Sequence, residues 1–133
     1  MSPSTAPTTT RRRPVVIGQW VLTGLLTAFF TMMGVPKVLG HGGWGTRFAA
    51  WGFPSWLVVV VGVAELGGAI MLLVPRLATL GGFLLALIIL GAIATHLVHG
   101  ETARVLVPLV LFAVLTAIAW ARRKADRTRP NRA

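Results

Sequence analysis

Four polar side chains stand inside or beside the long apolar stretches of this sequence: Lys37, Glu65, His96 and His99. Glu65 has the most apolar surroundings, in the middle of VVVVGVAELGGAIMLLV at residues 58–74. An ionised carboxylate in lipid is costly unless a partner holds it, so such acids are rare and usually functional. We therefore expect Glu65 to be protonated or paired with a cation such as Lys37. The alternative is an acid that only joins helices through hydrogen bonds.

These side chains meet only if their helices bring them to the same depth. Glu65 lies about ten residues below the outer end of its predicted helix, roughly 15 Å along the axis, so contact with His96 requires strong tilt or water. A pair with Lys37 requires the first helix to continue past Pro36 and the lysine stem to reach inward. The alternative role of Lys37 is an anchor at the membrane interface.

The histidines suggest ligand binding or proton transfer. His96 and His99 are three residues apart and share a helix face only if the helix continues to His99. A neutral imidazole at this position could bind a quinone carbonyl or pass protons. With His41 and Glu101 on the same side a metal site can be imagined, but no compact motif fixes a fourth ligand, and we predict none.

The composition is that of an integral membrane protein. Of 133 residues, 55% are hydrophobic and 12% charged, with a mean hydropathy of +0.77, whereas about 25% are charged in soluble domains. The net charge of +10 would suggest nucleic acid in a soluble protein, but here the charges lie in the tails and at helix ends, so we expect no nucleic-acid partner. The absence of cysteine excludes disulfides, thiolate catalysis and iron–sulfur clusters in this chain. No nucleophile–base pair, Walker loop or dinucleotide fingerprint is present, so whether the chain is an enzyme stays open.

The elements that position these residues follow from the apolar runs and their breaks. We predict an all-α, integral membrane four-helix bundle, because each run is long enough for a hydrocarbon core of ~30 Å. A disordered basic tail at 1–14 precedes the bundle at 15–121, and a basic cytoplasmic tail follows at 122–133. The predicted spans cover residues 15–35, 55–74, 77–98 and 105–121.

Between the first two spans, in residues 36–54, the glycines at 40, 42, 43 and 45 break the helix. The same segment contains four aromatic side chains, Trp44, Phe48, Trp51 and Phe53. Aromatic rings of this kind collect at the membrane interface. We expect a short interfacial segment, either an ordered loop or an amphipathic piece that partly covers the bundle.

Small residues predict which helix faces pack closely, as in other membrane bundles. The face of Glu65 carries Gly62, Gly68 and Ala69, so it should meet another helix rather than lipid. In the fourth span, alanines repeat every four residues at 113, 117 and 121, which predicts a closely packed face there.

Ten of the thirteen Lys and Arg residues fall on one side of the predicted bundle, together with both termini. Lys37, Arg47 and Arg104 are the three on the other side. By the positive-inside rule, both termini are cytoplasmic.

Three stretches and one spacing give this chain a resemblance to a known family. The stretches are GVPKVLG at 34–40, GFP at 52–54 and GVAELGGAIMLLVPR at 62–76. The spacing is the distance along the chain from the turn that ends the third stretch to His96 in ATHLVHGE. Between residues 15 and 120 the chain resembles the DoxX-like family of small four-helix membrane proteins, whose named member is a small subunit of a thiosulfate:quinone oxidoreductase. The resemblance implies a bacterial cytoplasmic membrane, a quinone as cofactor or ligand, and a membrane redox partner protein. The ligand-binding candidates are Lys37, Glu65 and His96, with His99 and Trp51 as secondary candidates.

Three functions fit these features. The first is a redox-associated subunit that binds a quinone or another apolar small molecule. The second is a non-enzymatic assembly or scaffold protein, and the third a small transporter, for which four helices are few unless the chain forms a homo-oligomer. Fold alone does not decide among them, because function is carried by sites.

Overall fold

The computed structural model describes residues 13–127, and its regular structure there is entirely helical. Four helices are long and apolar enough to cross a membrane, which confirms the predicted all-α bundle. The short α2 lies in the predicted interfacial segment. In chain order the helices are α1 (Arg13–Leu39), α2 (Trp44–Ala50), α3 (Ser55–Leu73), α4 (Ala78–Val98) and α5 (Thr102–Arg127).

Most of the two predicted tails lies outside the described residues. Where they are described, residues 13–14 and 122–127 are helical and extend α1 and α5. α1 also continues through Pro36, although proline removes one bond of the helical ladder. Neighbouring helices make such prolines tolerable in membranes. α5 begins three residues earlier than the predicted span, so Pro108 lies beyond its first turn.

Two glycines end the helices that carry Lys37 and His96. Gly40 and Gly100 have φ angles of 72° and 70°, a left-handed conformation that favours glycine. After each glycine, the next backbone N–H donates to the carbonyl five residues back, from His41 to Pro36 and from Glu101 to His96, both at 2.8 Å. This is the Schellman arrangement, and it places Glu101 beside the last turn of α4.

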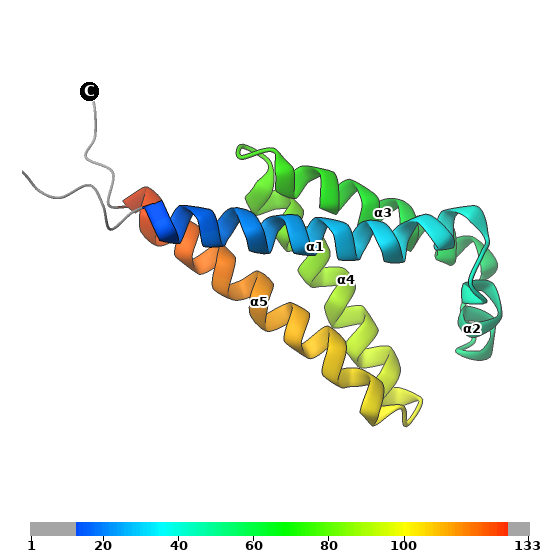
Figure 1. Ribbon diagram of the computed structural model, residues 1–133. Coiled ribbons are helices and arrows are strands. Elements are labelled where there is room, and N and C mark those ends of the chain that lie inside the picture. The colour runs from blue at the N-terminus through cyan, green and yellow to red at the C-terminus, as the bar shows by residue number, and fades with distance from the viewer. Residues whose placement is uncertain (1–12, 128–133) are drawn as a thin grey trace, which may run out of the picture.

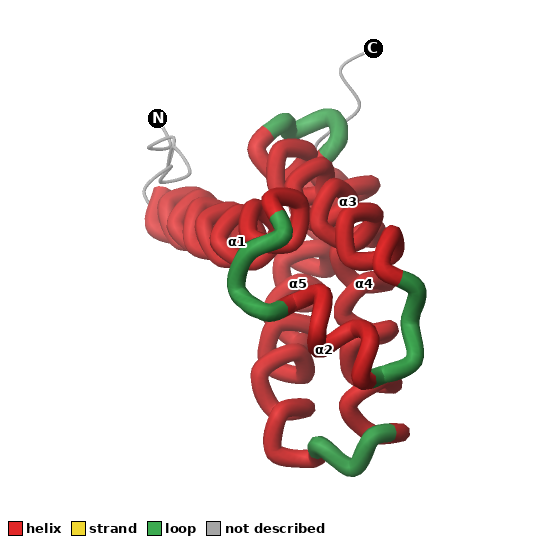
Figure 2. Tube along the Cα trace, turned by 90° about the vertical axis from the view of Figure 1, so that its right-hand side faces the viewer, coloured by secondary structure: helices red, strands yellow, loops and turns green. Residues whose placement is uncertain are grey.

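The spanning helices pack in sequence, α1 on α3, α3 on α4 and α4 on α5. At the end that carries the described termini, α5 lies against α1, and the guanidinium of Arg122 donates to Thr23 Oγ1 at 2.9 Å (Figure 1). Toward the opposite end α5 diverges from α1, and α2 lies beside the widening gap (Figures 1 and 2). The bundle is therefore a wedge, closed at one end and open at the other.

The core lies along the contacts between helices and contains Leu26, Phe30, Ala69, Leu72, Leu85, Ile89, Leu115 and Ile118. Gly68 and Gly81 allow α3 and α4 to approach closely, because a Cβ on Gly81 would stand 2.9 Å from the Gly68 carbonyl oxygen. The predicted close-packed alanine face of α5 is wrong, since Ala113 and Ala117 are exposed. Because α5 leans away from α1, larger side chains such as Leu115 fill the interface instead.

Candidate functional site

Lys37 and Glu65 form a buried ion pair between α1 and α3. The Lys37 ammonium donates to both carboxylate oxygens, with Nζ 2.6 Å from Oε1 and 2.7 Å from Oε2. Each residue is 5% exposed. The predicted partnership of these two residues is thus present, and of the two states expected for Glu65 it is the paired one.

Glycines at the helix crossing make this pair possible. A Cβ on Gly34 would lie 2.9 Å from the Gly62 carbonyl oxygen, and a Cβ on Gly62 would lie 2.8 Å from the Cβ of Lys37. The two backbones therefore touch one turn away from the charged residues. Because side chains lean toward the N-terminus of their own helix, and α1 and α3 run in opposite directions, Lys37 and Glu65 lean toward each other.

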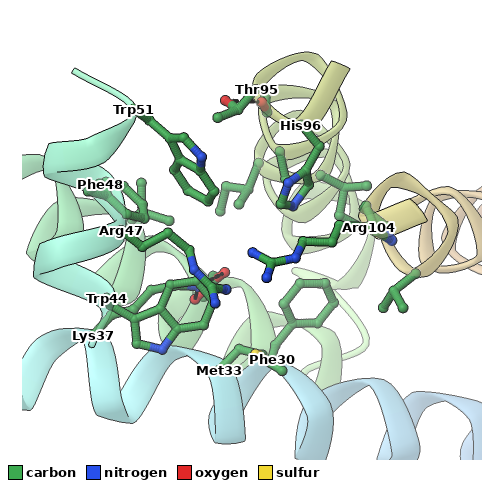
Figure 3. Close-up of a pocket in the computed structure, with 18 of the residues that line it drawn as sticks. Phe30, Met33, Lys37, Trp44, Arg47, Phe48, Trp51, Thr95, His96 and Arg104 are labelled. Carbon is green, nitrogen blue, oxygen red and sulfur yellow. Dashed lines mark hydrogen bonds and ion pairs between the residues drawn. The ribbon is translucent and has the colours of Figure 1, made fainter. Parts of the chain in front are cut away.

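An aromatic ring covers the exposed side of the pair. The Nζ of Lys37 lies 4.3 Å from the ring centroid of Trp44, and the guanidinium carbon of Arg47 lies 5.3 Å from the same ring. Both cations are held by the electron-rich face of the indole. Trp44 and Arg47 of α2 therefore lie over the ion pair (Figure 3).

A second polar cluster lies where α4 turns into α5. His96 Nδ1 is 2.8 Å from Glu101 Oε2, and the other oxygen of Glu101 is 3.5 Å from Arg104. Trp51 stands edge-on to His96, with ring centroids 5.4 Å apart. The hydrogen bond with His96, and after it the charge of Arg104, hold the pKa of Glu101 below its ordinary value. Glu101 therefore stays ionised at neutral pH and holds His96 in place.

Both polar clusters border one cavity of about 440 Å³ in the open part of the wedge. Its walls come from all five helices, and Figure 3 shows Trp51 facing His96, with the Arg104 side chain below His96. Apolar side chains, contributed by all five helices and by the loop that follows α2, form most of the lining. The polar lining residues are Lys37, Arg47, Glu65, Thr95, His96 and Arg104. The lining contains one lysine and two arginines against one carboxylate, so basic side chains outnumber acidic ones in it.

All three main candidates, Lys37, Glu65 and His96, thus line the same cavity, together with Trp51. His99 follows the last residue of α4, and its Nδ1 lies 2.8 Å from the Thr95 carbonyl oxygen; its ring neighbours Trp51 but does not line the cavity. Among the described residues, no group of three His, Asp or Glu side chains is arranged to hold a metal ion.

Sequence reasoning counted Arg47 and Arg104 only as charges on one side of the bundle and missed both as cavity residues. Both point into the cavity (Figure 3). The spacing of Glu101 and Arg104, three residues apart at the start of a helix, was a usable signal for Arg104. No sequence signal fixes Arg47, because the fold of α2 over the bundle decides where it points.

Comparison with known proteins agrees with this geometry. A model of the DoxX-like family matches residues 21–118, which covers most of the chain. The chain belongs to the DoxX-like family. The matched region of this DoxX-like protein contains the ion pair, α2, the cluster at His96 and the whole cavity lining. No match was found among curated proteins or among solved structures.

Proposed function

We propose that this DoxX-like protein is a redox-associated membrane subunit that binds a quinone, or a closely similar apolar molecule, in the cavity lined by all five helices. The observation that supports it best is the convergence of two polar clusters on one mainly apolar cavity. Its volume of about 440 Å³ is within the ~300–1,000 Å³ typical of small-molecule sites.

The chemistry of the lining suits a quinone head group. Quinone carbonyls are hydrogen-bond acceptors, and the cavity offers N–H donors from Arg47 and Arg104. The rings of Trp44 and Trp51 provide flat apolar surfaces for the quinone ring. An isoprenoid tail would follow the apolar side chains of α4 and α5 toward the gap where α5 leans away from α1.

The scaffold interpretation rests on one specific observation. Lys37 and Glu65 satisfy each other, and among the described residues no buried side-chain polar atom lacks a partner. A fully satisfied pair can serve packing alone. The two functions differ in one respect, because only a ligand-binding subunit requires the cavity to be open.

The test is a fluorescence titration of the purified protein in detergent with a short-chain quinone. We expect saturable quenching from Trp44 and Trp51, which line the cavity. The matched variants are Trp51→Phe, which should lose much of the quenching, and Trp20→Phe, which should keep it because Trp20 lies on α1 outside the cavity lining. An isoprenoid alcohol without quinone carbonyls is the control ligand.

A second pair of variants tests the cavity itself. A Cβ on Gly91 or on Gly82 would have no heavy atom within 4 Å, and both glycines are on α4, but only Gly91 lines this cavity. Gly91→Leu should abolish saturable quenching, and Gly82→Leu should preserve it. Quenching that rises linearly with quinone in the wild type, or equal quinone binding by Gly91→Leu and Gly82→Leu, would favour the scaffold function. Identification of the quinones and proteins that co-purify, by mass spectrometry, tests the redox association separately.

A further inference from the structure

A second groove, which the proposed function does not use, lies on the outer face of α4 and α5. Its volume is about 470 Å³, and it is lined almost entirely by apolar and small side chains. Gly82 and Ala86 of α4 and Ala119 of α5 leave the space, Leu115 forms the buried floor, and Phe83 and Trp120 stand at the sides with more than half of their surface exposed.

The groove has the length of one membrane leaflet. On α4 its lining runs from Thr79 to Leu90, and on α5 from Phe112 to Arg123. Eleven helical steps correspond to roughly 16 Å, which is about half of a hydrocarbon core of ~30 Å. A lipid chain enters from one interface and extends to the middle of the bilayer, whereas a partner helix would continue across both leaflets.

One end of the groove is basic. Arg123 lines it there, with its guanidinium carbon 5.9 Å from the ring centroid of Phe83, and Lys124 lies 5.7 Å from the ring of Trp120 in the same turn. Arg122 is directed away, to Thr23 on α1. The aliphatic stem of Arg123 can follow the apolar wall while its guanidinium faces the head-group layer.

We propose that this groove is a binding site for an anionic phospholipid. One acyl chain lies in the groove between α4 and α5, and the phosphate pairs with Arg123 at its basic end. A guanidinium binds phosphate oxygens through two parallel N–H donors, and basic pockets between transmembrane helices are known to select anionic head groups. A zwitterionic lipid could fill the groove but would gain less from the arginine.

A second copy of this chain fits the same groove less well. Copies that share one orientation in the membrane would bring the same basic end of α5 together with its counterpart. Arg123 and Lys124 would then face two further cations, and like charges at an interface are unfavourable. An anionic head group neutralises these charges instead.

The test is native mass spectrometry of the full chain released from nanodiscs of equal parts phosphatidylglycerol and phosphatidylcholine. We expect the wild type to retain phosphatidylglycerol in preference to phosphatidylcholine. Arg123→Gln should reduce this preference about fivefold, the contribution of one interfacial arginine. Arg127→Gln is the matched control, because Arg127 is exposed on the same helix beyond the groove.

A filling variant tests the chain site independently of charge. Gly82→Leu should lose retained lipid of both kinds, while Gly91→Leu, which lines the other cavity, should keep it. Equal retention of both lipids by the wild type, or wild-type selectivity in Arg123→Gln, overturns the proposal. Loss of a dimer in Gly82→Leu with no change in lipid also overturns it, and assigns the groove to a second copy. Quinone quenching in these variants reports on the first cavity, so the two proposals fail separately.

Discussion

Removing one charge from the Lys37–Glu65 pair should destabilise the protein far more than the loss of one hydrogen bond. Glu65→Gln leaves the Lys37 ammonium, which is 5% exposed, without a counter-ion. Breaking a buried pair in this way costs about 3–5 kcal/mol, whereas an average side-chain hydrogen bond between membrane helices contributes about 0.6 kcal/mol. For Glu65→Gln we expect a loss of about 3 kcal/mol in the free energy of unfolding, the lower end of the range for a broken buried pair. The loss is at the lower end because glutamine keeps one hydrogen-bond acceptor and the Trp44 ring still faces the Lys37 ammonium.

A double-mutant cycle separates the charge interaction from packing. Lys37→Met alone should also be strongly destabilising, since it leaves the carboxylate unpaired. The double variant Lys37→Met/Glu65→Gln has no unpaired charge, so its loss of unfolding free energy should be smaller than that of either single variant, which requires a coupling energy above about 3 kcal/mol, the upper end of the usual range. Measured additivity of the two single effects would contradict a direct ion pair.

The assay is reversible unfolding in mixed micelles of increasing denaturing detergent, followed by circular dichroism. Glu101→Gln is the matched control, because it removes a carboxylate that also pairs with neighbours but has 29% of its side chain exposed. Water solvates that site, so its change in unfolding free energy should be far smaller. A loss in Glu65→Gln no larger than that of one hydrogen bond would refute the reasoning and return Glu65 to a simple packing role.

Three further predictions test the helix crossing, the second cluster and the topology. Gly62→Ala should cost about 1–3 kcal/mol of stability, because its Cβ would overlap α1; Gly67→Ala, on the open side of the same helix, should cost nothing in the same unfolding assay. The lowered pKa of Glu101 means that its pairing contributes above the ordinary value of 4.5 and is lost as pH falls through the lowered value. A tryptophan fluorescence change over this acid range should disappear in Glu101→Gln; its persistence would assign the change elsewhere. Reporter fusions at Gly43 and Gly100 should fall on the side opposite the C-terminus, as the charge distribution predicts, and a cytoplasmic signal at either position would refute the orientation.

Much of the fold follows from local features of the sequence. Four apolar runs of sufficient length predict four spanning helices. A single segment in lipid can satisfy all of its backbone hydrogen bonds internally only as a helix. The small residues around Glu65 predict the buried face of α3, and the structure confirms it with Gly62, Gly68 and Ala69 all buried. The pairing of Lys37 with Glu65 could also be predicted from the sequence, since an ionised carboxylate in lipid requires a partner.

Tertiary structure alone decided where the cavity lies. The angle between α5 and α1 creates the wedge, and no local pattern encodes that angle, because an alanine on a spanning helix can face lipid as well as a neighbouring helix. This is why the alanine spacing of α5 misled the prediction, with Ala113 and Ala117 exposed and Leu115 buried. The placement of Arg47 and Arg104 in the cavity has the same cause, since each depends on how its element folds back over the open end of the bundle.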